Sequence, residues 1–144
     1  MRRTQSRLAL PLVLVLALAA IVAACGGSAA QPAGSGAPAA LPAEVGVDEA
    51  AKIRDAGGVI VDVREPSEWA EGYIEGAVLI SLGDLAGRAG ELPKDKQIVV
   101  VCRSGNRSKE GRDILLSAGL TSVTSMAGGV RDWAASGRPL VTGQ

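Results

Sequence analysis

A continuous apolar segment that ends in a cysteine constrains the fold of this chain more than any other feature. Residues 98–101 are Ile-Val-Val-Val, and Cys102 follows them directly. A short β-branched run without polar alternation is typical of a strand buried on both faces of a parallel sheet. Residues 108–118 can form a helix that Gly119 ends. The order strand, tight loop, helix therefore places Cys102 at the carboxyl end of a buried strand.

The loop after Cys102 has the composition of an anion site. A tight loop before a helix turns backbone N–H groups toward its centre, and the helix start adds the positive end of a dipole. Gly105 can adopt the positive φ that such a loop needs, while Arg103 and Arg107 place positive charge near the sulfur. Because these features stabilise a thiolate, we interpret Cys102 as the reactive residue. The alternative is a small, inert hydrophobe that ends a core strand.

The counts of cysteine and histidine limit how this thiol works. The chain has two cysteines, Cys25 and Cys102, and no histidine. Without histidine, neither a Cys–His catalytic pair nor a His-containing zinc site can form. A Cys25–Cys102 disulfide is the structural alternative for an exported protein, but it would tie the loop to a segment with no folding signal. We therefore expect a thiolate activated by electrostatics alone, with no metal and no cofactor.

The N-terminal region differs from the rest of the chain. Three arginines, the last of them Arg7, precede an apolar stretch over residues 8–24 that ends in small residues next to Cys25. This pattern resembles a bacterial lipoprotein signal. The resemblance implies that residues 1–24 are a signal peptide and that Cys25 carries lipid. An uncleaved anchor is the alternative, since about 17 apolar residues are only just enough to cross a bilayer.

A tether and a single domain follow. Residues 25–42 are rich in glycine, alanine, proline and serine and carry no charge, which is typical of a flexible linker. Residues 43–144 are enough for one core but not for two, and we expect a monomer. The N-terminal arginines stay on the cytoplasmic side. We therefore expect a lipid-anchored domain on the outer side of the cytoplasmic membrane, or in an outer membrane where there is one.

The chain without its signal is mildly acidic. Removing the three N-terminal arginines takes the basic count from 15 to 12 against 15 acidic residues, a formal charge of −3. This balance does not indicate nucleic-acid binding. Four basic residues are nevertheless close to the cysteine loop in sequence, and a locally positive site favours a small anion. They are Arg103, Arg107, Lys109 and Arg112.

Apolar runs and helical segments alternate through the domain. The expected strands cover residues 59–63, 77–80, 97–101 and 121–126. The expected helices cover residues 49–56, 82–88, 108–118 and 130–135, with Asp48 as the first N-cap and Pro66 opening a further helical turn. This alternation predicts an α/β fold with a central parallel sheet of about five short strands and helices on both faces. Ligand sites in such sheets lie beyond the carboxyl ends of the strands.

Four segments resemble the single-domain rhodanese family of thiosulfate sulfurtransferases, in the family's order. One position departs from the family, because Tyr73 stands where it usually has histidine. We expect the fold to tolerate this change. The matching segments are Val61-Asp62-Val63-Arg64-Glu65 with Glu68-Trp69, Glu71-Gly72-Tyr73-Ile74-Glu75-Gly76-Ala77, the loop from Cys102 to Ser108, and Gly128-Gly129-Val130-Arg131-Asp132-Trp133 with Gly137-Arg138-Pro139.

The resemblance implies a two-step sulfur transfer. Cys102 attacks the outer sulfur of thiosulfate, sulfite leaves, and cyanide or a thiol then removes the sulfur from the Cys102 persulfide. Loop N–H groups hold the negative charge, and side chains of the loop contribute. We interpret Asp62 and Arg64 as a structural ion pair or loop anchor. The residues expected to bind substrate and persulfide are Arg103, Ser104, Gly105, Asn106, Arg107 and Ser108.

Two other functions remain open. Cysteine phosphatases have a similar loop with five residues between cysteine and arginine, whereas four separate Cys102 from Arg107 here. Ser108 occupies the position of the phosphatase arginine, so we expect poor binding of phosphate. The second alternative is a non-enzymatic module that carries sulfur for a partner or binds one.

Overall fold

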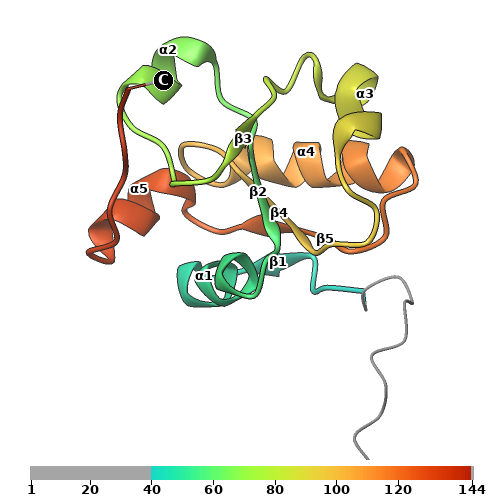
Figure 1. Cartoon of the computed structure of the whole chain (residues 1–144), viewed down its shortest axis with the longest axis horizontal. Coiled ribbons are helices and arrows are strands. Elements are labelled where there is room, and N and C mark those ends of the chain that lie inside the picture. Colours follow the sequence, from blue (N-terminus) through green and yellow to red (C-terminus); the bar gives the residue numbers. More distant parts are fainter. Residues whose placement is uncertain (1–39, 144) are drawn as a thin grey trace, which may run out of the picture. The chain divides into compact units, whose positions relative to one another are not determined.

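Five parallel strands form a single sheet in the computed structural model, which describes residues 40–143. The order across the sheet is β1-β5-β4-β2-β3, so β4 lies in the centre (Figure 1). Because all pairings are parallel, the carboxyl ends of the strands meet at one edge. The strands are β1 (Glu44–Val45), β2 (Val59–Asp62), β3 (Val78–Leu79), β4 (Ile98–Val101) and β5 (Val123–Met126).

Helices cover both faces of this sheet (Figure 1). Apolar side chains of α3 and α4 pack on one face with Val100 and Val123, and those of α1 and α5 pack on the other with Val99 and Val101. All four residues of β4 are buried. The helices are α1 (Val47–Asp55), α2 (Pro66–Ala70), α3 (Leu85–Arg88), α4 (Asn106–Ser117) and α5 (Gly129–Ala135), and a 3-10 turn covers Ala89–Glu91.

The expected α/β fold with helices on both faces is confirmed, and the expected elements match to within three residues at each end. Pro66 opens α2, as predicted. The predicted N-cap is wrong: Gly46 precedes α1, while the Asp48 carboxylate accepts a hydrogen bond from Arg138 at 2.8 Å. The two-residue edge strand β1 was not predicted, because so short a segment has no periodicity.

Helix α4 begins two residues earlier than the sequence suggests. Gly105 adopts a left-handed conformation with φ of +100°, so the chain enters the helix at Asn106. Asn106, Arg107 and Ser108 therefore lie on the first turn of α4 rather than in the preceding loop. The expected positive φ at Gly105 is confirmed.

A buried ionic cluster joins the end of β2 to α2. Arg64 Nη2 lies 2.7 Å from Asp62 Oδ2, with side chains 4% and 0% exposed. Trp69 Nε1 donates to the same Asp62 oxygen at 2.8 Å. Arg64 also donates to the backbone carbonyls of Glu68 and Gly72. The cluster therefore holds α2 and the turn after it against the carboxyl edge of the sheet.

Replacing Asp62 by asparagine tests how much this cluster stabilises the fold. Asp62→Asn leaves the Arg64 guanidinium buried without its counter-charge, and we expect it to lower the free energy of unfolding by about 3–5 kcal/mol. Asp55→Asn removes an aspartate that is 64% exposed and paired with Arg54, and this control is expected to cost under about 1 kcal/mol. Urea denaturation at pH 7 measures both losses. Equal small losses would contradict a buried ionic anchor.

Candidate active site

Cys102 lies at the carboxyl end of the central strand, as the sequence predicts. Its side chain is 1% exposed and packs in the apolar cluster between the sheet and α4. The backbone N–H of Gly105 lies within hydrogen-bond distance of the sulfur, with N and Sγ 3.1 Å apart. A buried thiol that receives a backbone N–H is placed to hold negative charge on sulfur.

The loop is closed by its own polar groups. Ser108 is fully buried, and its hydroxyl donates to the carbonyl of Gly105 at 2.7 Å. This hydroxyl therefore fixes the turn that points the Gly105 N–H at the sulfur. Arg103, Ser104 and Asn106 are exposed, and no residue between 40 and 143 makes a side-chain hydrogen bond or ion pair with them.

Arg107 is held by a carboxylate from α2. Its two terminal nitrogens each lie 2.7 Å from an oxygen of Glu68. The hydrogen bond from Arg107 is the main cause that lowers the pKa of Glu68 to about 2. Glu68 in turn raises the pKa of Arg107, with a smaller contribution from Cys102. The guanidinium therefore lies within electrostatic reach of the sulfur while its orientation is fixed by Glu68.

The start of α5 packs directly against the cysteine loop. Val130 N donates to the carbonyl of Cys102 at 2.9 Å, and Arg131 N donates to that of Arg103 at 3.2 Å. Gly129 has φ of +60°, and a Cβ there would overlap the Cys102 carbonyl oxygen. Only glycine allows this close approach. The sequence of this segment resembles the family but carries no local signal of its contact with the loop.

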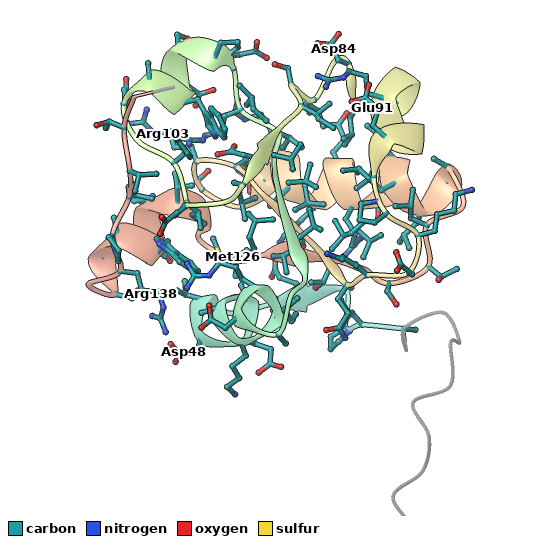
Figure 2. All side chains as sticks on the ribbon, viewed as in Figure 1. Asp48, Asp84, Glu91, Arg103, Met126 and Arg138 are labelled. Atoms are coloured by element: carbon teal, nitrogen blue, oxygen red, sulfur yellow. The ribbon has the colours of Figure 1, made fainter. Side chains whose placement is uncertain are left out.

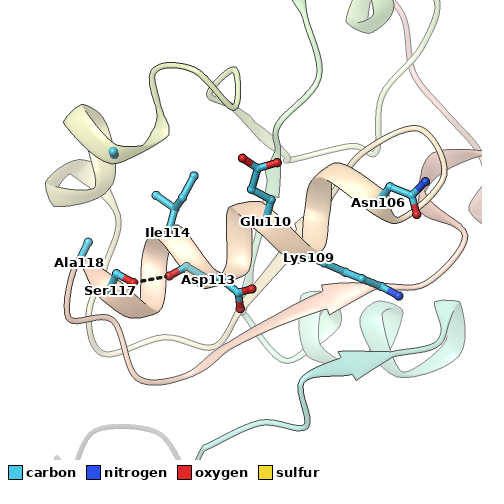
Figure 3. Close-up of a pocket in the computed structure, with 8 residues that line it drawn as sticks. Asn106, Lys109, Glu110, Asp113, Ile114, Ser117 and Ala118 are labelled. Carbon is cyan, nitrogen blue, oxygen red and sulfur yellow. Dashed lines mark hydrogen bonds between the residues drawn. The ribbon is translucent and has the colours of Figure 1, made fainter.

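Cys102 does not line the groove that runs along α4. The groove has a volume of about 760 Å³, and Asn106, the first residue of α4, lines its end nearest the cysteine loop (Figure 3). Along this groove the Ser117 hydroxyl donates to the carbonyl of Asp113. The other residues that line the groove are Ala86, Lys109, Glu110, Ile114 and Ala118.

A smaller cavity of about 250 Å³ borders the cysteine loop through Arg103. Figure 2 shows Arg103 on the side of the domain where α2 and α5 lie. Because Val130 and Arg131 also line this cavity, its wall is hydrogen-bonded to the cysteine loop. The lining residues are Arg64, Glu71, Gly72, Arg103, Val130, Arg131, Ala134 and Leu140.

Residues 40–143 offer no group of three or more side chains suited to hold a metal ion. Within that same range, no helix has the length and apolar character to cross a bilayer. Cys25, the expected signal peptide and nearly all of the expected tether lie outside the described residues.

The fold agrees with comparisons to known proteins. A sequence model of the rhodanese-like domain matches residues 46–136. The chain belongs to the rhodanese-like family. It is 37% identical over 83 residues to a sulfurtransferase of Allochromatium vinosum, covering 58% of this chain and 78% of that protein. It is 34% identical over 86 residues to the thiosulfate sulfurtransferase GlpE of Pseudomonas syringae pv. syringae, covering 60% of this chain and 81% of that protein.

A solved structure also shows the rhodanese fold. The crystal structure of a rhodanese-related protein from Thermoplasma volcanium matches with a TM-score of 0.65 and 29% identity, covering 69% of this chain and 98% of that one. Family and homologues together support sulfur transfer as the general chemistry of this rhodanese.

The contact at Gly129 is tested by adding one methyl group. Gly129→Ala combines the cost of a left-handed alanine with overlap against the Cys102 carbonyl, and we expect a loss of about 2–5 kcal/mol. Gly137 also has positive φ but has open space around its Cα, so Gly137→Ala is expected to lose only about 1–2 kcal/mol. Urea denaturation compares them. Indistinguishable losses would show that the close approach does not constrain the loop.

The Glu68–Arg107 pair predicts a dependence of stability on pH. Because the folded pKa of Glu68, about 2, is below its ordinary 4.5, the pair stabilises fully above pH 4.5 and loses its contribution as pH falls toward 2. Glu68→Gln is expected to cost about 1 kcal/mol at pH 7 for this partly exposed pair.

The difference in the free energy of unfolding between Glu68→Gln and the natural protein should shrink when urea denaturation is repeated at pH 4 and pH 3. Glu75→Gln is the control, since Glu75 is exposed and has no side-chain partner within residues 40–143. A cost for Glu68→Gln that stays constant from pH 7 to pH 3 would rule out the assigned pairing.

Proposed function

We propose that this rhodanese transfers sulfane sulfur from thiosulfate, or a similar donor, to cyanide or a thiol through a persulfide on Cys102. The observation that carries the proposal is the Gly105 N–H, whose nitrogen lies 3.1 Å from Sγ in a loop closed by Ser108. A fixed backbone donor at a buried sulfur stabilises the Cys102 thiolate, both when it attacks the donor and when it leaves in the second step. No separate base is then needed.

In each of the two steps, one bond to sulfur forms as another breaks. The Cys102 thiolate attacks the outer sulfur of thiosulfate, the S–S bond of the donor breaks, and its electron pair leaves with sulfite. Cyanide or a thiolate then attacks the outer sulfur of the persulfide, and the electron pair returns to Cys102. The products are thiocyanate or the persulfide of the acceptor.

The two loop arginines take different roles in this proposal. Arg103 has no side-chain partner within residues 40–143, so its charge is free to attract the anionic donor. Arg107 is held by Glu68 and acts as a fixed charge near the sulfur. The backbone of the loop through Ser104, Asn106 and Ser108 surrounds the outer sulfur. Asp62 and Arg64 support the loop indirectly. Arg64 is paired with Asp62 and donates to the carbonyl of Glu68 in α2, whose side chain holds Arg107.

The exported location is proposed from the sequence pattern alone. We propose that Cys25 carries lipid and that residues 25–42 tether the domain at the outer side of a membrane. The donor and acceptor would then be molecules of the cell envelope.

One observation favours a second candidate, a sulfur carrier that delivers its persulfide to a partner protein. Cys102 is only 1% exposed, which would protect a persulfide from small thiols. A phosphatase is disfavoured, because Arg107 is engaged by Glu68 and Ser108 by the Gly105 carbonyl.

Mass spectrometry of the full chain after thiosulfate treatment tests the proposal. We expect one added sulfur atom on Cys102, which cyanide removes as thiocyanate. Cys102→Ser should reduce both the adduct and thiocyanate formation to background, while the matched variant Cys25→Ser retains both. Sulfur transfer that persists in Cys102→Ser would overturn the assignment. An adduct that cyanide leaves in place favours the carrier, and phosphate-ester hydrolysis without an adduct favours the phosphatase.

A further inference from the structure

The carboxylate of Glu68 occupies the part of Arg107 that an oxyanion would bind. Both terminal nitrogens of Arg107 are engaged, each by one Glu68 oxygen at 2.7 Å. A guanidinium binds phosphate and related oxyanions through the same pair of parallel hydrogen bonds. The Glu68 side chain is 21% exposed and that of Arg107 34%, so solvent weakens this pair only in part. An anion near the loop must therefore compete with Glu68 for Arg107.

Arg107 belongs to the electrostatic surroundings of the cysteine. It lies on the first turn of α4, directly after the cysteine loop. The hydrogen bond to Glu68 is the main cause that raises the pKa of Arg107, and the charge of Cys102 adds to it. A guanidinium released from Glu68 would therefore add positive charge within reach of the sulfur. Arg103 is already a cation of this loop that no side chain between residues 40 and 143 offsets.

The position of Glu68 does not depend on Arg107 alone. Its carboxylate accepts from the backbone N–H of Glu65 at 3.2 Å, and its carbonyl accepts from Arg64 at 3.1 Å. Arg64 is itself buried against Asp62. Because the pKa of Glu68 is lowered to about 2, its carboxylate is charged at neutral pH. Helix α2 therefore presents a fixed negative charge to Arg107.

We propose that Glu68 is a specificity-determining residue of this rhodanese, which weakens the retention of oxyanions at the cysteine loop by offsetting Arg107. The proposal rests on the sulfur-transfer function above. In that reaction each turnover leaves sulfite beside the persulfide, and sulfate resembles the donor in charge and shape. With Arg107 held by Glu68, sulfite is released and sulfate does not block the cysteine, at the cost of a higher KM for thiosulfate. Glu68 acts through Arg107 and is a positioning residue.

Sulfate inhibition of thiocyanate formation tests this role, since sulfate resembles thiosulfate but has no sulfur to transfer. Glu68→Gln keeps an acceptor for the Glu65 N–H and removes the charge. We expect its inhibition constant for sulfate and its KM for thiosulfate each to fall about tenfold at constant ionic strength, as gain of one charged hydrogen bond predicts. Glu110→Gln removes a carboxylate of α4 that has no side-chain partner in the described part of the chain, and should leave both constants unchanged.

A double variant separates a role through Arg107 from a merely structural one. When Arg107→Gln is the starting protein, adding Glu68→Gln should leave the sulfate inhibition constant unchanged, because no guanidinium remains to be released. A structural role of Glu68 predicts weaker sulfate binding in Glu68→Gln, which is the opposite direction. An inhibition constant that stays the same or rises in Glu68→Gln, or that falls equally without Arg107, would overturn the proposal.

A sulfate titration followed by NMR needs no turnover, so it distinguishes failure of this role from failure of the proposed function. The Gly105 nitrogen lies 3.1 Å from the Cys102 sulfur, so the Gly105 amide resonance reports anions at the loop. We expect a lower sulfate dissociation constant in Glu68→Gln than in the natural protein. Equal constants, or no binding in either protein, would contradict the role of Glu68. A natural protein that forms no thiocyanate would contradict the proposed function instead.

Discussion

The close approach of Gly129 to the Cys102–Arg103 backbone is the constraint on which the site depends. Hydrogen bonds from Val130 and Arg131 hold the carbonyls of Cys102 and Arg103, and a Cβ on Gly129 has no room. With these carbonyls fixed by α5, the loop holds the Gly105 N–H against the sulfur, with N and Sγ 3.1 Å apart. The same contact brings Arg131 beside the loop. One backbone contact therefore holds both the cysteine loop and the cavity that borders this loop through Arg103.

The arginines around the loop differ in what binds them, and this difference determines what each can do. Arg64 is buried, and all three of its guanidinium nitrogens donate to Asp62 or to backbone carbonyls. Arg107 is fixed by Glu68. Arg103 has no side-chain partner within the described residues and is the loop cation open to a substrate. Of these three arginines in the described residues, Arg103 is the one whose charge no side chain offsets.

Much of the fold was predictable because it is encoded locally. The run from Ile98 to Val101 predicted the buried central strand, and Gly105 predicted the left-handed turn after the cysteine. Two features of the site were not predictable. The Glu68–Arg107 pair joins residues 39 positions apart, and the Gly129 contact depends on how α5 packs against the loop. Neither leaves a periodic or neighbouring signal in the sequence, since both arise from the register between distant elements.

A crystal structure of the protein after treatment with thiosulfate tests the central claim most directly. The account predicts a second sulfur atom bonded to Sγ of Cys102 and surrounded by backbone N–H groups of residues 103–108, with the Gly129 contact intact. An ordered loop around an unmodified Cys102 thiol after the same treatment would contradict it.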